Sequence, residues 1–271
     1  MSDTEHAFQE LTKHLAHEGY IFVCPSPETQ GRVVEKRKSN TSTADANNAA
    51  DVFGWNLSIS QKRLDTFLPQ PLKETLAKAS ILVPAEDNNF LRSTIRVSNF
   101  YPPEIPDRNE TATPLYYIHS SFPAASDSVF FGPDTYLFTS FLRHATRHLQ
   151  QAPTTIIDVC CGSGAGAIHM ARTFPQARNL GLDLNPQALK YGAVNARLAG
   201  ATVEFLESNL YASVPSSLHE SGGVDLIVSN PPYIASSLDG KDLPVYADGG
   251  ANFGLDISMR IVEEGRDILS R

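Results

Sequence analysis

Apolar and polar positions in the C-terminal half of the chain follow a repeating strand-helix order. Short apolar runs, which are typical of buried strands, alternate with stretches whose apolar residues recur at helical spacing. The predicted strands cover 154–160, 179–184, 202–206 and 225–229. The predicted helices cover 136–149, 186–198 and 255–269, with one more beginning near Gly164. Repeated β-α-β units predict an α/β fold with a Rossmann-like, doubly wound and mostly parallel sheet.

The first 122 residues show shorter and more mixed patterns. Residues 5–18 have the spacing of an amphipathic helix, and 20–24 have the composition of a strand. Residues 35–51 are small and polar, which predicts a flexible loop. We therefore expect a small α+β domain over 1–122, followed by the sheet domain over 123–271.

A glycine-rich loop stands where the first strand of the sheet meets its helix. Gly162 and Gly164 would let the backbone turn sharply and approach a ligand. Asp183 follows Gly164 by nineteen residues, at the end of the next strand, where a carboxylate can bind both hydroxyls of a ribose. The combination predicts an adenosine-containing ligand. Asp158, before the loop, favours S-adenosylmethionine with its charged amino group over a dinucleotide. Alternatively, Asp158 has no ligand role and only stabilises the loop by accepting hydrogen bonds from backbone N–H groups.

The last apolar run of the sheet ends at Asn230-Pro231-Pro232-Tyr233. Two prolines in succession cannot continue a central strand, because neither offers an N–H to the ladder. An amide, rigid carbonyls and an aromatic ring are therefore expected at the carboxyl edge of the sheet, where ligands bind. Asn and Pro are also common turn residues. The four residues alone would fit a plain turn, and the glycine-rich loop favours a functional site.

Residues 154–258 resemble class I S-adenosylmethionine-dependent methyltransferases, in particular the N5-glutamine methyltransferase (HemK-like) and small-domain groups. The segments that carry the resemblance, in the family's order and spacing, are IIDVCCGSGAGAI, LGLDLNPQALKYGAVNARLAG, VEFLESNLY, VDLIVSNPPYIA and DGGANFGLDIS. FFGPDT at 130–135 is similar to the segment that precedes the family's catalytic domain. Residues 1–128 do not resemble the helical bundle of bacterial release-factor methyltransferases, which leaves the substrate open.

The resemblance implies roles for three sets of residues. The cofactor would be held by Asp158, Gly162, Gly164, Asp183, Leu184, Asn209, Leu210 and Asn230. The catalytic residues would be Asn230, Pro231, Pro232 and Tyr233. The substrate side would include Pro133, Asp134 and Thr135. Cys160 stands where the family usually has a glycine, and Asn209 where it usually has an acid near the adenine. Both departures are expected to be compatible with cofactor binding.

These residues predict methyl transfer to a planar nitrogen. The side-chain oxygen of Asn230 and the carbonyl of Pro231 can each accept one N–H of the acceptor, and Tyr233 offers a flat face for stacking. Neither a metal nor a general base is required. The expected acceptor is a protein glutamine. Two alternatives stay open: an amino group of adenine or guanine flipped out of a nucleic acid, and a truncated, non-catalytic fold that serves as an interaction subunit.

Charge and composition narrow the partners. The formal net charge is -8, and 151–271 carries eight Lys and Arg against thirteen Asp and Glu, a net charge of −5. Duplex binding needs a basic surface, so a protein substrate is favoured. No run approaches the roughly 20 apolar residues of a membrane span, and no secretory signal or zinc-type cluster is present. Three cysteines are too few for a disulfide framework, so a cytoplasmic setting is expected.

The resemblance also implies a sheet of seven strands, whereas the apolar pattern supplies four. We therefore expect a methyltransferase domain that is C-terminally incomplete and lacks its last strands. The outer edge of the fourth strand would then be exposed, which is an aggregation liability. Such a chain is expected to be unstable or weakly active as given.

Overall fold

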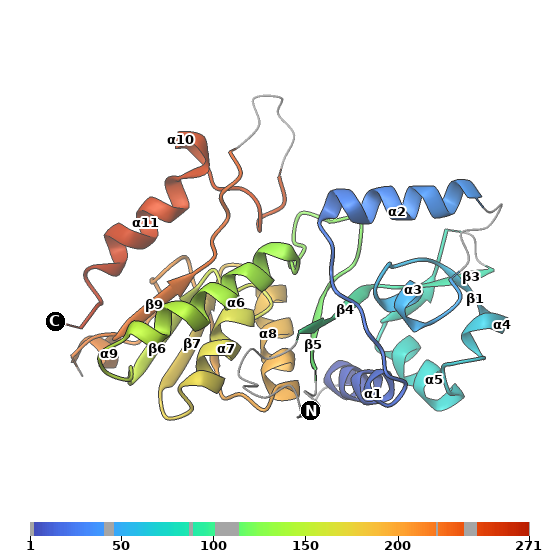
Figure 1. Ribbon diagram of the computed structural model, residues 1–271, viewed down its shortest axis with the longest axis horizontal. Coiled ribbons are helices and arrows are strands. Elements are labelled where there is room, and N and C mark those ends of the chain that lie inside the picture. The colour runs from blue at the N-terminus through green and yellow to red at the C-terminus, as the bar shows by residue number, and fades with distance from the viewer. Residues whose placement is uncertain are drawn as a thin grey trace. The chain divides into compact units, whose positions relative to one another are not determined.

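The computed structural model describes residues 3–40, 46–86, 89–100, 114–220, 222–235 and 243–270. The chain divides into two compact units (Figure 1). The N-terminal unit is formed mainly by Met1–Phe100 and Pro114–Pro123, and the C-terminal unit mainly by Ala124–Phe130 and Asp134–Arg271. Among the residues listed above, no helix is long and apolar enough to cross a membrane.

The N-terminal unit combines short helices with two small antiparallel sheets. Its helices are α1 (Asp3–His17), α2 (Pro27–Asn40), α3 (Ala49–Phe53), α4 (Gln61–Leu64) and α5 (Gln70–Lys78). Its strands are β1 (Ile59–Ser60), β2 (Leu82–Pro84), β3 (Phe90–Ser93), β4 (Ile95–Phe100) and β5 (Leu115–Ser120). The strand orders are β1-β3-β2 and β4-β5. Helix α1 buries its predicted apolar face, which includes Phe8, Leu11 and Leu15.

The flexible loop predicted over 35–51 is partly wrong. Residues 35–40 continue helix α2, and 49–51 begin helix α3; 41–45 lie outside the described residues. The polar composition concealed contacts with distant residues. Arg37 of α2 forms an ion pair with the buried carboxylate of Asp51, and its guanidinium lies 5.6 Å from the ring centre of Trp55. Buried Gln30 of the same helix donates to the carbonyl of Trp55 (2.7 Å). A helix with little apolar surface is thus held in place by polar side chains that reach distant residues.

The strand predicted at 20–24 is absent as a regular ladder. The N–H of Asn99 donates to the carbonyl of Phe22 (2.8 Å), but the N–H of Phe22 donates to the side-chain oxygen of Asn99 (2.6 Å). A side chain therefore replaces a main-chain partner. The segment runs beside β4 without the repeated backbone pairing that defines a strand.

The C-terminal unit has the predicted alternation of strands and helices. Its strands are β6 (Thr155–Val159), β7 (Arg178–Asp183), β8 (Glu204–Glu207) and β9 (Leu226–Ser229). Its helices are α6 (Pro133–Ala145), α7 (Ala165–Thr173), α8 (Pro186–Leu198), α9 (Ser216–Glu220), α10 (Ala251–Gly254) and α11 (Asp256–Gly265). All strands pair in parallel, in the order β8-β7-β6-β9. The predicted Rossmann-like, doubly wound sheet is confirmed.

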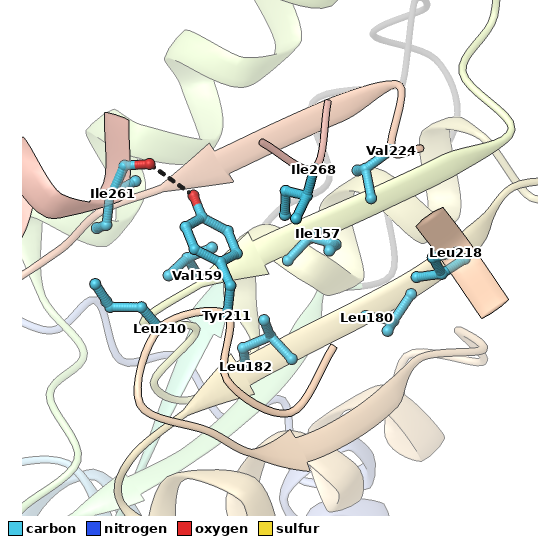
Figure 2. Close-up of a cluster of buried hydrophobic side chains, with 10 residues drawn as sticks. All are labelled: Ile157, Val159, Leu180, Leu182, Leu210, Tyr211, Leu218, Val224, Ile261 and Ile268. Carbon is cyan, nitrogen blue, oxygen red and sulfur yellow. Dashed lines mark hydrogen bonds between the residues drawn. The ribbon is translucent and has the colours of Figure 1, made fainter. Parts of the chain in front are cut away.

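The two faces of this sheet bury different apolar clusters. Because side chains alternate along a strand, Ile157 and Val159 of β6 face a cluster that contains Tyr211 and residues of α11. Figure 2 shows this cluster and the hydrogen bond from the Tyr211 hydroxyl to the carbonyl of Ile261 (2.9 Å). Ile156 lies on the opposite face, against α6 and α7. Asp158, two residues on, points to the same face as Ile156 and so reaches the start of α7.

Candidate functional site

The carboxyl ends of the four parallel strands meet at one edge of the sheet. Val159 of β6 pairs with Ser229 of β9 and with Leu182 of β7, and Asp183 pairs with Glu207 of β8. The hydroxyl of Ser229 also donates to the carbonyl of Val159 (2.6 Å). The segments that leave β6 and β9 therefore start side by side. The chain order reverses between these two strands, which is where doubly wound sheets bind ligands.

The glycine-rich loop after β6 adopts left-handed backbone conformations. Cys160, Gly162 and Gly164 have φ values of 58°, 53° and 83°. A Cβ built on Gly162 meets nothing within 4 Å, so open space lies beside the loop there. A Cβ on Gly164 would lie 3.1 Å from both Gly192 and the ring of Phe205. Gly162 thus leaves room for a ligand, whereas Gly164 allows α7 and α8 to pack closely.

The conformation of Cys160 explains why a glycine is expected at this position. A left-handed backbone costs a residue with a Cβ about 1–2 kcal/mol, because the Cβ crowds the carbonyl oxygen. The Cys160 side chain packs against the buried cluster of Figure 2, which offsets part of this cost. Burial raises the pKa of Cys160 to about 12, so its thiol stays protonated at neutral pH. The structure shows no disulfide at Cys160 or Cys161.

Asp158 is almost wholly buried, with 1% of its surface exposed. Its Oδ2 accepts the N–H of Ala167 in the first turn of α7 (2.8 Å), so one oxygen braces the loop. Its Oδ1 is buried and has no hydrogen-bond partner among the described residues. Burial raises the pKa of Asp158 to about 8; the Ala167 N–H acts in the opposite direction, and the charge of Asp183 adds to the rise. A cationic ligand group at Oδ1 would offset this cost.

Asp183 connects the end of β7 with the glycine-rich loop. Its Oδ2 accepts the N–H of Gly162 (2.8 Å), and its Oδ1 accepts the N–H of Asn185 (2.9 Å). Burial raises the pKa of this carboxyl group, and these N–H groups partly counter the effect. Each carboxylate oxygen can accept a second hydrogen bond, so Asp183 keeps capacity for a ligand. The next residue, Leu184, is 57% exposed and presents an apolar surface at the same edge.

The segment after β8 supplies one exposed amide. Asn209 is exposed, whereas Leu210 is buried with a φ of 50°. The hydroxyl of Ser208 donates to the carbonyl of Leu210 (2.7 Å) and accepts the N–H of Ser213 (3.0 Å). This turn fixes the direction of Asn209. The sequence did not single out Ser208, although serine is a common turn former.

The segment 230–233 continues directly from β9. Asn230, Pro231 and Pro232 are half-buried. In the described part of the chain the Asn230 side chain has no hydrogen-bond partner, which leaves an amide available at the sheet edge. Tyr233 is 54% exposed, and its hydroxyl donates to Oδ2 of Asp134 in α6 (2.6 Å). The Asp134 carboxylate raises the pKa of Tyr233 to about 12.

The contact between Tyr233 and Asp134 joins two predicted sets of site residues. Pro133 and Asp134 begin helix α6, and Thr135 is buried in its first turn. Ninety-nine positions separate Tyr233 from Asp134, so no local pattern could have revealed their pairing.

Two glycines, Gly249 and Gly254, pack against the backbone of Tyr233 where their chain segments cross. A Cβ on Gly249 would lie 2.8 Å from the Cα of Tyr233, and a Cβ on Gly254 would lie 2.4 Å from its carbonyl oxygen. The N–H of Gly249 donates to the carbonyl of Ile234 (2.9 Å), and the N–H of Ile234 donates to that of Ala247 (3.0 Å). These glycines have a packing role, because a side chain at either position would meet the backbone of Tyr233.

The parallel sheet, its switch point and the glycine-rich loop define a nucleotide-type ligand site of the Rossmann-like class. Residues 138–243 match the family model described as methyltransferase small domain. The predicted resemblance to S-adenosylmethionine-dependent methyltransferases is confirmed by this match. The described residues contain no group of three or more His, Cys, Asp or Glu that could hold a metal ion.

Relatives align with less than half of the chain. The release factor glutamine methyltransferase of Mycolicibacterium smegmatis is 47% identical over 88 residues, covering 31% of this chain and 30% of that protein. The protein of the same name from Deinococcus radiodurans is 36% identical over 118 residues, covering 40% and 39%. The 4-amino-L-phenylalanine/4-methylamino-L-phenylalanine methyltransferase of Streptomyces pristinaespiralis is 39% identical over 83 residues, covering 31% and 27%. Each alignment spans less than half of the relative's length.

Proposed function

We propose that this protein transfers a methyl group from S-adenosylmethionine to a planar nitrogen, foremost the side-chain amide of a protein glutamine. The observation that carries the proposal is the place of Asn230. Its amide, without a partner in the described part of the chain, follows β9 beside the glycine-rich loop of β6. None of the three cysteines forms a disulfide, which supports a cytoplasmic setting.

The cofactor side of the site fits S-adenosylmethionine on three observations. Gly162 opens space beside the loop, Asp158 has a buried oxygen that could receive the cofactor's ammonium group, and Asp183 retains acceptor capacity for the ribose. Leu184 and Asn209 would contact the adenine, through an apolar surface and an amide. When bound, S-adenosylmethionine supplies an electrophilic methyl group on a sulfonium. The chain has to exclude water from this group and orient the acceptor.

The acceptor side would work by orientation. The side-chain oxygen of Asn230 and the carbonyl of Pro231 would each accept one N–H of the acceptor amide. Both N–H groups of the acceptor would then be fixed. The nitrogen lone pair would turn out of conjugation with the amide carbonyl and toward the methyl group, so the site would act by orienting the acceptor. The half-buried prolines keep the carbonyl positions rigid. The Asp134 contact fixes the ring of Tyr233 as a flat surface for the acceptor.

The names of the relatives support a planar acceptor nitrogen. Two are glutamine methyltransferases and one acts on an arylamine. Amides and arylamines share a delocalised lone pair, which is the property the Asn230 site would address. The glutamine assignment draws further support from the acidic balance of 151–271, since a net charge of −5 disfavours a polyanionic nucleic acid.

Asn230→Ala is the direct test. Because an oriented hydrogen-bond acceptor at the reacting group contributes several kcal/mol, we expect the methyl-transfer rate to fall by roughly 10²–10³. Transfer of labelled methyl groups to protein and nucleic-acid fractions of a cell extract, counted separately, measures the rate and the acceptor class. The Kd of S-adenosylhomocysteine, measured by calorimetry, should change less than about threefold. An unchanged transfer rate would remove Asn230 from the mechanism.

A further inference from the structure

Phe253 is the most exposed of the large apolar side chains in the described part of the chain, at 92%. Its backbone is left-handed, with φ 59° and ψ 30°, and so is that of Asn252. Two consecutive residues with a Cβ rarely adopt this conformation, because each is strained. Gly250 and Gly254, also left-handed, flank them. The backbone is therefore strained around an aromatic ring that is held in solvent.

The strained turn is fixed to the proposed acceptor site. Gly254, the residue after Phe253, packs against the carbonyl oxygen of Tyr233 so closely that a Cβ would lie 2.4 Å from it. The side-chain amide of Asn252 donates to Asp256 at the start of α11, which stabilises the turn. Phe253 is thus held close to the segment that carries Asn230, by contacts that leave its ring uncovered.

Other exposed apolar side chains lie on the chain segments that cross here. We call the following set the apolar rim: Tyr233, Ile234, Val245, Phe253 and Leu255. Hydrogen bonds between Ile234 and the 247–249 segment hold its parts together. An exposed apolar group of this kind, close to a site, is typical of a docking surface. Aromatic anchors of this size often carry much of the binding energy at an interface.

Acidic side chains at the apolar rim select the partner: Asp134 accepts from Tyr233, and Asp256 accepts from Asn252 beside Phe253. Residues 243–270 contain two basic residues against five acidic ones, a net charge of −3. One of the basic residues, Arg260, is paired with Glu264 (2.8 Å). A polyanion is repelled by such a surface, whereas a polypeptide with apolar and basic residues is attracted to it.

We propose that the apolar rim, with Phe253 as its anchor, docks a polypeptide segment that carries apolar and basic residues next to the methyl acceptor. This inference rests on the proposed function, because it places the docking surface beside Asn230. It adds the recognition element: Phe253 contributes to substrate affinity and not to the chemical step.

The test uses the full chain and two fluorescent peptides, each with one glutamine. In the first peptide the glutamine is flanked by Leu and Lys, and in the second by Asp and Glu. With S-adenosylhomocysteine present, we expect the wild type to bind the first peptide at least tenfold more tightly than the second. Phe253→Ala should weaken binding of the first peptide about tenfold, which is typical for truncation of an aromatic anchor. Phe141→Ala is the matched control, because Phe141 is a 66% exposed aromatic on α6, and it should leave the Kd unchanged.

Several outcomes would overturn the docking surface: no peptide binding by the wild type, equal binding of both peptides, or equal loss in the two variants. Binding of a single-stranded oligonucleotide that Phe253→Ala weakens would overturn the polypeptide assignment. An unchanged Kd of S-adenosylhomocysteine shows that the Phe253→Ala variant is folded. Asn230→Ala separates the two proposals, because it should lower the transfer rate by roughly 10²–10³ and keep peptide binding. Peptide binding without transfer by the wild type would keep the docking surface and remove the proposed activity.

Discussion

The loop that follows β6 and the segment that follows β9 leave the same sheet edge, but different contacts hold them. The β6 loop is fixed from within a single β-α-β unit, by the carboxylates of Asp158 and Asp183 and by the glycines between them. The β9 segment is fixed from outside, by Asp134 of α6 and by Gly249 and Gly254. The first set of contacts is mostly buried, whereas Tyr233 in the second is half exposed.

This difference matches the tasks proposed for the two segments. A cofactor that does not vary can be bound by a preformed, buried loop, since the groups that contact it need not move. A macromolecular acceptor has to enter and leave, so its side of the site must be open to solvent. The structure keeps such an open segment in place through a few long-range contacts to its backbone and to the hydroxyl of Tyr233. Those contacts are the points at which the comparison can be tested.

Gly254→Ala should have the largest effect. The added Cβ would meet the carbonyl oxygen of Tyr233, a backbone atom that cannot move aside, at a position where φ is 82°. We expect a loss of about 3 kcal/mol in the free energy of unfolding, the sum of overpacking and left-handed strain. Chemical denaturation followed by circular dichroism measures it.

Gly200→Ala provides the control for this change. Gly200 has a φ of 63°, and a Cβ there meets nothing within 4 Å. Its substitution should cost about 1 kcal/mol, from the backbone alone. Equal losses in the two variants would show that the Gly254 crossing does not hold the β9 segment.

Asp158→Asn tests the buried side of the comparison through the pH dependence of stability. The pKa of Asp158 is raised to about 8 in the folded protein, whereas an unfolded aspartate titrates near 4. The folded state therefore binds the extra proton between these values, and its stability falls as the pH rises from about 4 to about 8. The slope from one such group is at most about 1.4 kcal/mol per pH unit. The asparagine variant should show a shallower fall of Tm over this range.

Asp225→Asn serves as the control of opposite sign. Hydrogen bonds from Thr154 hold the pKa of Asp225 below its usual range, so its contribution is present above the unfolded pKa and lost as the pH falls. This variant should lose stability relative to the wild type at neutral pH and approach it in acid. If Asp158→Asn kept the full wild-type slope between pH 4 and 8, Asp158 would already be ionised in the folded protein.

The sequence was sufficient to predict the sheet and the neighbouring positions of the glycine-rich loop and Asp183. Strands buried on both faces give continuous apolar runs, and the glycines and Asp183 stand at fixed distances along one β-α-β unit. The helix over 186–198 was predicted with its observed ends, because Asn185 caps it and Pro186 begins it. Short-range rules of this kind need no knowledge of tertiary contacts.

Features that depend on distant partners were not predictable in the same way. Helix α2 lacks a strong apolar pattern and is held by side-chain contacts with distant residues, of Arg37 with Asp51 and of Gln30 with Trp55. The left-handed turn at Phe253 follows the glycine pair 249–250. Its position depends on the packing of Gly254 against the backbone of Tyr233. The roles of the individual site residues stay predictions that the variants above can test.

Tyr233→Phe should have the smallest effect and is the finest test of the open segment. It keeps the aromatic face but removes the hydroxyl that donates to Asp134. Because this hydrogen bond is partly exposed, we expect a loss below about 1 kcal/mol in stability. The acceptor surface would be less fixed, so kcat/KM for methyl transfer should fall roughly threefold.

Asp134→Asn, whose amide oxygen can still accept from Tyr233, should lose less. Since the pKa of Tyr233 is about 12, the wild-type rate should show no inflection from this group near pH 10. A loss in Asp134→Asn with an unchanged rate in Tyr233→Phe would mean that the charge of Asp134, and not its contact with Tyr233, matters for the acceptor.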